Sequence, residues 1–358
     1  MSDCCCNCDK RPTIVLVGLN FGRHIVAQLM EGEGRKFMKL TGLCDIDRPK
    51  AEALNEKYGG GLKIYTSLDD VLADPDVRTV GLYTGPVHRA DLLRKIIRAG
   101  KDVMTTKPFE LDPEAGTAIL KEAAELGRII HLNSPNPGIS PDLEQILKWQ
   151  KELGLGRPVA ARAETYARYN EKPDGSWYDN PDLCPAPPIF RLGIYLINDL
   201  VRLMGRVKRV SVFSTRLFTG RPTADNSQLS LEFESGALAC IFDSFCVRDG
   251  DHYRNSLELN FDNGTVFRNV GPCRDMAASS SLTAIQADEI TGELKRRVSA
   301  TATTVSRSGG YDWEGFVKAI NHEPGAPTYE IENVIEPLRV IRAMAEAEKT
   351  GQVVTIVR

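Results

Sequence analysis

The stretch that decides the fold is Thr13-Ile14-Val15-Leu16-Val17, which is followed at once by Gly18-Leu19-Asn20-Phe21-Gly22. Five apolar residues in succession are typical of a strand that is covered on both faces. The glycines predict a tight turn, and apolar residues at helical spacing follow over Arg23–Met30. Strand, glycine turn and helix in this order predict the start of an α/β domain.

Strands and helices keep alternating from this point to about residue 132. Further strands are expected at Met38–Cys44, Lys63–Tyr65, Val80–Tyr83, Asp102–Thr105 and Ile129–Leu132, with helices between them. This alternation predicts a doubly wound parallel sheet over residues 12–132.

The second part of the chain, residues 133–358, has a different pattern. Strand-like runs over residues 207–268, separated in places by turn pairs, predict an antiparallel sheet with helices on one face. The polar, Ser/Thr-rich stretch Asp275–Arg307 is expected to be a long excursion. Trp313–Ile320 and residues 334–349 are expected to be closing helices, and the second of them is expected to pack back on the first domain.

Composition narrows the class of protein. A length of 358 residues fits two domains, and a net charge of −3 argues against a nucleic-acid partner. There is no run of 18 apolar residues, so no membrane partner is expected, and no apolar signal segment follows Met1. These features lead us to expect a cytoplasmic protein.

Four of the nine cysteines lie between Cys4 and Cys8. A structural zinc site needs four ligands, usually two such pairs, and the chain has no second pair. We therefore expect residues 1–11 to be a disordered, Cys-rich tail without a metal. Metal binding or redox chemistry is the alternative interpretation of this run.

The turn Gly18–Gly22 is placed as a dinucleotide-binding turn would be. Glycines there let the backbone approach a pyrophosphate at the helix N-terminus. Asn20, Phe21 and Gly22 are candidate contacts, although the pattern is one residue shorter than the usual fingerprint. The alternative is a turn that needs glycine for packing alone.

Asp45 ends the second strand and strengthens the prediction. A carboxylate there accepts hydrogen bonds from the adenosine ribose hydroxyls, and its charge disfavours a 2′-phosphate. NAD is therefore favoured over NADP, although Arg48 could pair with such a phosphate. The polar insert Glu31–Lys36 explains the long spacing from Gly18 to Asp45.

Lys107 follows the fifth strand, in Thr105-Thr106-Lys107-Pro108-Phe109. Ligands of open α/β sheets bind outside the carboxyl ends of the strands, so Lys107 is expected to point towards the cofactor. A surface lysine before a turn is the alternative.

These segments, together with Tyr83–His88, Ala99–Val103 and Gly193–Asp199, occur in the order found in one known family. The chain resembles the glucose–fructose oxidoreductase, inositol dehydrogenase and rhizopine-catabolism (Gfo/Idh/MocA) family over nearly its whole length. The resemblance implies an NAD-binding Rossmann domain and a second α+β domain with an open, mostly antiparallel sheet. It also implies a homo-oligomer (dimer, tetramer or hexamer) that forms through that sheet.

The resemblance implies site residues as well. The family's Glu-Lys-Pro motif supplies an active-site lysine beside the nicotinamide, and here Thr106 stands at the Glu position before Lys107. Thr84, Pro86 and His88 are implied to lie along the nicotinamide side of the cleft.

The family's second motif, Asp-x-Gly-x-His-x-x-Asp, falls on residues 191–198. Arg191, Tyr195 and Asn198 replace its Asp, His and final Asp, while Gly193 matches. In a helix, Arg191, Tyr195, Asn198, Asp199 and Arg202 form one polar stripe on an otherwise apolar surface. We expect this stripe to face a cleft, although a solvated stripe with structural ion pairs is the alternative.

Tyr195 is the candidate proton-transfer group. Its pKa, ordinarily about 10, would have to be lowered by nearby cations, for which Lys107 and Arg191 are candidates. Substrate contacts are expected from the second domain, from aromatic faces and polar groups that suit a sugar ring: Asn133, Tyr166, Arg168, Trp177, Tyr178, Arg191, Asn198 and Asp199.

The leading prediction is an NAD-dependent oxidoreductase of a sugar, glycoside or polyol, with oxidation of a ring hydroxyl to a 3-keto glycoside as the preferred direction. One alternative is a glycosidase that oxidises its substrate transiently with bound NAD. Another is a nucleotide-binding sensor without catalysis, against which Lys107 and Tyr195 argue.

Overall fold

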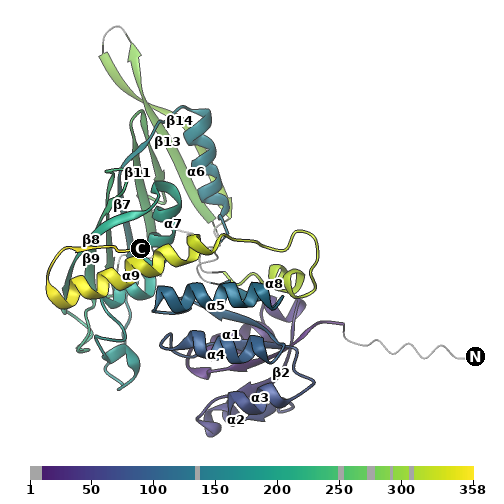
Figure 1. Ribbon diagram of the computed structural model, residues 1–358. Coiled ribbons are helices and arrows are strands. Elements are labelled where there is room, and N and C mark those ends of the chain that lie inside the picture. Colours follow the sequence, from purple (N-terminus) through teal and green to yellow (C-terminus); the bar gives the residue numbers. More distant parts are fainter. Residues whose placement is uncertain (1–9, 134–137, 249–253, 272–278, 291–292, 306–309) are drawn as a thin grey trace, which may run out of the picture. The chain divides into compact units, whose positions relative to one another are not determined.

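The computed structural model describes residues 10–133, 138–248, 254–271, 279–290, 293–305 and 310–358 (Figure 1). The cysteine run Cys4–Cys8 lies outside the described residues. The chain divides into two compact units. Unit 1 comprises the residues up to Glu110, Ala115–Asn133 and Tyr311–Thr328, and unit 2 comprises the rest.

Unit 1 is built on a six-stranded, all-parallel sheet, which confirms the predicted doubly wound fold. Its strand order is β3-β2-β1-β4-β5-β6. The strands are β1 (Thr13–Val17), β2 (Lys39–Cys44), β3 (Lys63–Tyr65), β4 (Thr79–Leu82), β5 (Asp102–Thr106) and β6 (Ile130–Asn133). The helices are α1 (Leu19–Met30), α2 (Arg48–Lys57), α3 (Leu68–Ala73), α4 (Arg89–Arg98) and α5 (Pro113–Glu125).

A late segment completes unit 1. The short helix α8 (Trp313–Ile320) places Trp313 and Phe316 in the same core as Ile25 of α1. We expected the last helix, residues 334–349, to return to the first domain. Helix α8 belongs to unit 1 and α9 (Ile331–Thr350) to unit 2. The packing of residues 334–349 on the first domain stays a prediction.

Unit 2 is built on a nine-stranded sheet of order β14-β13-β12-β11-β7-β10-β9-β8-β15. One pair, β10 with β7, is parallel, and the other pairs are antiparallel, as predicted. The strands are β7 (Pro158–Tyr166), β8 (Val207–Thr215), β9 (Asn226–Phe233), β10 (Leu238–Ser244), β11 (Arg254–Phe261), β12 (Gly264–Arg268), β13 (Ser279–Ile290), β14 (Glu293–Val305) and β15 (Val354–Thr355).

Helices α6 (Pro141–Glu152), α7 (Ile194–Met204) and α9 cover one face of this sheet. Ile146, Leu200 and Met344 of these helices share one core with the inward side chains of the strands, such as Ala163 and Leu229. Alternate residues of β7, β9 and β10 point to the other face, which none of the described helices of unit 2 covers (Figure 1).

The expectation for Asp275–Arg307 is wrong in part. β13 and β14 pair antiparallel from Ser279 with Val305 to Ile290 with Glu293, and so extend the sheet. Leu282 and Ala284 are buried there, on one face of β13. The small hydroxyl residues around them carry little hydrophobic signal, although threonine itself favours strands.

A buried ion-pair group ties two helices of unit 2 to the sheet. The guanidinium of Arg268 on β12 donates to Asp142 of α6 at 2.8 Å and to Asp199 of α7 at 2.7 Å. It also donates to the amide oxygen of Asn255 at 2.8 Å. Arg268 is only 2% exposed. Because burial of a single unpaired charge is costly, the three charged groups depend on one another.

We predict that Arg268→Met lowers the free energy of unfolding by about 3–5 kcal/mol at pH 8, because two buried carboxylates lose their cation. Burial already raises the pKa of Asp199. A protein is destabilised as the pH rises when one of its carboxyl groups has a raised pKa in the folded state. The stability deficit of the Arg268→Met variant should therefore shrink towards pH 5, where such a carboxyl takes up a proton more readily.

Chemical denaturation at both pH values measures this deficit. Arg157→Met is the control, because its ion pair with Asp262 has an arginine side chain that is 89% exposed. Exposed pairs contribute little. Equal losses of stability in the two variants would contradict the prediction.

Candidate active site

The turn between β1 and α1 requires glycine at its first position. Gly18 has φ +86°, and a Cβ there would lie 2.9 Å from the backbone nitrogen of Thr84 and from the carbonyl carbon of Tyr83. The N-cap residue of α1 is Gly18, which has no side chain to cap the helix, and the first backbone N–H of the helix, that of Leu19, is bonded to Asp45. This is the cradle that a phosphate group fits.

Asp45 braces the same turn from the end of β2. Its Oδ2 accepts a hydrogen bond from the backbone N–H of Leu19 at 2.7 Å, and its Oδ1 accepts one from Asp47 at 2.9 Å. Each carboxylate oxygen has a second lone pair, which leaves acceptor capacity for a ribose hydroxyl. The predicted ribose contact is compatible with this geometry and stays a prediction.

The other predicted contacts of the turn differ in exposure. Phe21 is 41% exposed and its ring lies 6.2 Å from that of the buried Tyr83. Gly22 is buried, but a Cβ there would make only ordinary contacts at 3.7 Å, so packing alone does not require this glycine. Asn20 accepts a hydrogen bond from Lys50 at 2.9 Å.

Residues of α1 and α2 line a pocket in unit 1: Leu19, Asn20, Arg23, Lys50, Ala53, Leu54 and Lys57. Three of them are cations, which makes this part of unit 1 favourable for an anion.

The loop after β4 holds the three residues implied for the nicotinamide side. Thr84 is half-buried, Pro86 is buried and His88 is exposed. His88 has φ +53° at the N-terminal end of α4, a backbone conformation that is uncommon for residues other than glycine.

Lys107 lies directly after β5 and is half-buried. Its neighbours Thr106 and Pro108 both accept hydrogen bonds through their backbone carbonyls from one buried side chain, Arg89. Arg89 was missed in the sequence. It could have been found as an arginine on the buried face of α4, four and eight residues before Leu93 and Ile97.

In unit 2, the segment of the second motif starts with a π-helical turn, Ile189–Gly193, and continues as α7. Gly193 is required there, because a Cβ would collide with Oδ2 of the buried Asp243 on β10. Burial raises the pKa of Asp243 well above its ordinary range. π-helical turns occur frequently at functional sites.

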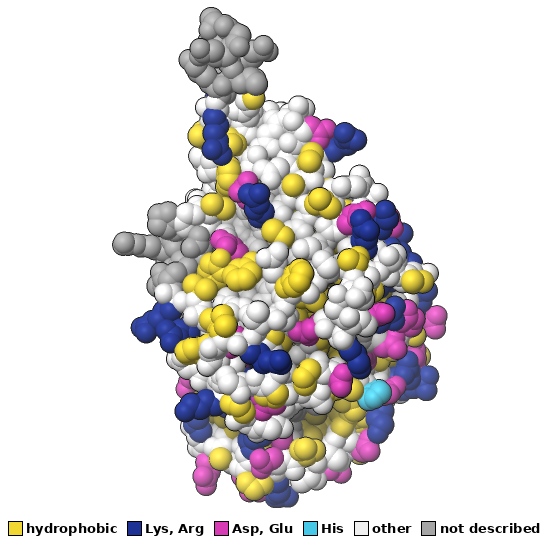
Figure 2. All heavy atoms as spheres, turned by 90° about the vertical axis from the view of Figure 1, so that its left-hand side faces the viewer, with side chains coloured by type: hydrophobic (Ala, Val, Ile, Leu, Met, Phe, Trp, Pro, Cys, Tyr) yellow, Lys and Arg dark blue, Asp and Glu magenta, His cyan; other side chains and the backbone are white. Residues whose placement is uncertain are grey.

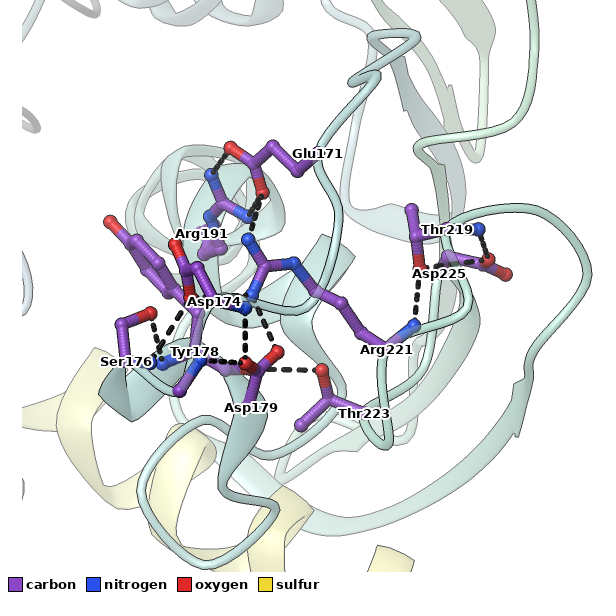
Figure 3. A network of polar contacts seen from close by, with 11 residues as sticks. Glu171, Asp174, Ser176, Tyr178, Asp179, Arg191, Thr219, Arg221, Thr223 and Asp225 are labelled. Carbon is purple, nitrogen blue, oxygen red and sulfur yellow. Dashed lines mark hydrogen bonds and ion pairs between the residues drawn. The ribbon is translucent and has the colours of Figure 1, made fainter.

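Arg191 does not face a cleft as expected. Its guanidinium donates two hydrogen bonds to Glu171, at 2.6 and 2.7 Å (Figure 3). It also lies 4.2 Å from the ring centroid of Tyr178, 4.8 Å from that of Tyr169 and 5.0 Å from that of Phe245. A bidentate, aromatic-enclosed arginine holds its surroundings in place rather than binding a substrate.

Arg221 extends this network to a second loop. It is 7% exposed and donates to Asp179 at 2.5 Å and to Asp174 at 3.1 Å (Figure 3). Trp177 stacks on Tyr178 with ring centroids 4.1 Å apart and packs against the unit 2 core. The aromatic residues predicted to contact a sugar here are largely packed on their own unit.

The rest of the polar stripe is also enclosed. Asn198 and Asp199 are 6% and 5% exposed, and Asp199 is paired with Arg268. The expectation that the whole stripe lines a cleft is therefore wrong, because Asp199 is buried against Arg268 and Asn198 is buried as well. Tyr195 is half-buried.

Three further predicted substrate contacts have partners within their own units. Asn133 is 1% exposed and accepts a hydrogen bond from the backbone of Asp312 at 3.0 Å. Tyr166 donates to Glu164 and packs its ring 6.0 Å from that of Phe242. Arg168 lies 4.5 Å from the ring centroid of Phe218. Their roles in substrate binding stay predictions.

Residues 13–134 match the oxidoreductase family with an NAD-binding Rossmann fold, and residues 144–267 match the GFO/IDH/MocA C-terminal domain. The chain belongs to this family. An inositol 2-dehydrogenase of Rhodococcus jostii is 36% identical over 121 residues, which are 34% of this chain and 32% of that protein. An inositol 2-dehydrogenase of Rhizobium meliloti is 30% identical over 92 residues, 26% of this chain and 27% of that protein.

The matched stretches span only 27% to 38% of the length of the curated relatives. Solved structures match over more of the chain. An aldose–aldose oxidoreductase from Caulobacter crescentus has a TM-score of 0.70 at 18% identity and covers 97% of this chain and 100% of its own. A levoglucosan dehydrogenase in complex with NADH and L-sorbose has a TM-score of 0.70 at 14% identity, covering 97% and 99%. At such identities the likeness shows the fold.

The residues present fit NAD. The positive φ of Gly18, the N-terminus of α1 and the carboxylate of Asp45 lie together at the carboxyl edge of the sheet. They are what a pyrophosphate and a ribose hydroxyl need. None of the helices in the described part of the chain is long and apolar enough to cross a membrane.

We predict that Gly18→Ala weakens NAD binding by roughly tenfold or more, a loss of at least about 1.4 kcal/mol. The Cβ displaces the backbone of Tyr83 and Thr84 and strains the turn by about 1–2 kcal/mol. Calorimetric titration with NAD and thermal unfolding measure both effects.

The matched control is Gly22→Ala, four residues further along the same segment. Its Cβ has room, so its thermal stability should stay near that of the unsubstituted protein. A Gly18→Ala protein that binds NAD normally would show that the turn does not cradle the cofactor.

Proposed function

We propose that this protein is an NAD(H)-dependent oxidoreductase that transfers hydride between the nicotinamide and a secondary alcohol or ketone of a sugar, glycoside or polyol. The observation that carries the proposal is the shared position of the Gly18 turn, Asp45, Thr84 and Lys107. They follow β1, β2, β4 and β5 at the carboxyl edge of one parallel sheet. That edge is where such sheets bind dinucleotides and their substrates.

The proposed roles follow from the chemistry of the side chains. Held by the Gly18 turn and Asp45, the nicotinamide cofactor would supply the hydride acceptor for oxidation of the alcohol and the hydride donor for reduction of the ketone. The ammonium group of Lys107 donates a hydrogen bond to the substrate oxygen and so stabilises negative charge on it. The phenolate of Tyr195 takes the alcohol proton during oxidation, and the hydroxyl formed in this way returns the proton to the ketone oxygen during reduction. Because Arg191 is bonded to Glu171, Lys107 remains the proposed cation for Tyr195.

The preferred direction is oxidation of a ring hydroxyl to a 3-keto glycoside. The names of the relatives support the wider class, since they include inositol dehydrogenases and a levoglucosan dehydrogenase. The buried ion pair with Arg268 removes Asp199 from the substrate contacts that we propose. Trp177 and Tyr178 are half-buried, and their substrate contacts stay predictions, with Tyr195 as the central residue of unit 2.

Two finer expectations stay predictions. A homo-oligomer would bury apolar side chains on the uncovered sheet face of unit 2, where Phe213 is 76% and Leu238 59% exposed. The face shown in Figure 2 carries apolar groups between charged side chains of both signs. The expected cytoplasmic location is likewise untested.

We predict that Tyr195→Phe lowers turnover by about 10²- to 10⁴-fold, because general acid–base catalysis contributes that much. The affinity for NAD should stay the same, because the substitution lies in unit 2. Steady-state rates and NAD titrations test both points. Tyr58→Phe, in unit 1 away from the predicted site, is the control. Near-normal turnover of Tyr195→Phe would overturn the role of the hydroxyl.

A panel of sugars, polyols and aryl glycosides, incubated with NAD, tests the function itself. Steady formation of NADH, followed by absorbance, is the expected result. Release of the aglycone without net NADH would instead indicate a glycosidase that oxidises its substrate transiently. Binding of a nucleotide without any turnover would indicate a sensor.

A further inference from the structure

Arg89 is the most fully enclosed cation of unit 1. It is 2% exposed and stands at the first position of α4. Burial lowers its pKa to about 10. A positive charge at a helix N-terminus is unfavourable, and its removal from water is costly. Because the burial of a cation at this place costs free energy, we expect the contacts of the guanidinium to serve a specific role.

The contacts of Arg89 join the two loops of the candidate active site. Its Nη1 donates to the carbonyl of Thr106 at 2.6 Å and to that of Pro108 at 2.8 Å. Its Nη2 donates to the carbonyl of Thr84. Thr106 and Pro108 are the residues on either side of Lys107, so one side chain holds the backbone before and after the lysine.

Glu110 attaches the same loop to α4 by the opposite charge. It is 3% exposed, and its Oε2 accepts a hydrogen bond from the backbone N–H of Ala90 at 2.7 Å. A carboxylate at this helix end satisfies an N–H group that α4 cannot bond itself, and it offsets the charge of Arg89. Residues 106–110 are therefore held to the start of α4 at three points.

We propose that Arg89 is a positioning residue for Lys107. Its planar guanidinium fixes the backbone on both sides of Lys107 relative to Thr84, and so sets where the ammonium group stands at the cofactor edge. This inference rests on the proposed role of Lys107. A guanidinium suits this role because its two terminal nitrogens point apart and can donate hydrogen bonds to both loops at once. An ammonium group has only one nitrogen from which to donate.

Lys101 provides a matched comparison at the opposite edge of the sheet. It is 7% exposed, and its Nζ donates to the carbonyl of Asp74 at 2.8 Å and to that of Val77 at 2.6 Å. It precedes β5, whereas Lys107 follows it. Arg89 and Lys101 are thus two buried cations that bind backbone carbonyls, one at each end of the same strands.

The experiment compares Arg89→Met, Arg89→Lys, Lys101→Met and Lys107→Met in the full chain, with NAD and the substrate found in the panel. The rate of hydride transfer is measured per folded molecule, together with KM for the substrate. We expect Arg89→Met to lower kcat about 100-fold, as a displacement near 1 Å can. KM should change much less, and Arg89→Lys should recover part of the rate. Lys101→Met should lower stability while its kcat stays close to normal.

Hydrogen exchange gives a readout that does not need turnover. Arg89→Met should speed exchange in peptides that cover residues 103–112, and Lys101→Met should do so only near residues 74–80. If Arg89→Met does not fold, R89M/E110Q removes both buried charges and carries the same comparison.

A double-substitution cycle separates the inference from the proposed function. If Arg89 acts through Lys107, R89M/K107M is no slower than Lys107→Met alone. Normal turnover of Lys107→Met would overturn the proposed catalytic role of Lys107, and with it the inference about Arg89, while leaving the oxidoreductase function in place. If Lys107→Met has a reduced kcat but the kcat of Arg89→Met is no lower than that of Lys101→Met, only the inference is overturned. The inference is also overturned if the losses of rate in Arg89→Met and Lys107→Met add up in the double variant.

Discussion

The carboxylate of Asp45 is the interaction on which the cofactor edge of unit 1 depends. It receives the first N–H of α1 and the N–H of Asp47, and so joins the end of β2 to the turn after β1. The backbone of Gly18 fits between this carboxylate and the loop at Tyr83 and Thr84, where no Cβ has room. The three strand ends β1, β2 and β4 therefore hold one another in place. The free backbone donors of α1 and the remaining acceptor capacity of Asp45 result from that arrangement.

The parts of the fold that burial determines could be predicted from the sequence. The run Thr13–Val17 and its successors are apolar because both faces of a parallel sheet are covered, and each lies within a few residues of the expected position. The hairpin β13–β14 could not be predicted in the same way. Many of its residues are small or polar, and among its described side chains the buried apolar ones are Leu282 and Ala284, beside the buried Ser280.

Charged residues set the second limit to prediction. The motif helix has one polar stripe and is otherwise apolar. Such a pattern predicts that the stripe is exposed, because the sequence does not reveal ionic partners that lie far away along the chain. Asp199 meets Arg268 across 69 positions and Asp142 meets it across 126. Arg89 was overlooked for the same reason, since its partners are backbone carbonyls that any residue type supplies. Lys107, in contrast, could be placed at the cofactor edge from the sequence, because it directly follows a strand. The end of that strand fixes its position, and no knowledge of its contacts is needed.

The departures from the family's second motif are linked physically. Arg191 reverses the charge of the first motif position, and Glu171 restores neutrality by binding it with both carboxylate oxygens. Tyr169, Tyr178 and Phe245 lie around the guanidinium of Arg191, whose side chain is 12% exposed, whereas that of Glu171 is 32% exposed. Arg191 and Glu171 thus satisfy each other's charge. The chemistry that the motif's acidic residue would perform therefore has to come from other groups. On the motif helix that leaves Tyr195, half-buried one turn beyond Arg191, and on the sheet edge of unit 1 it leaves Lys107.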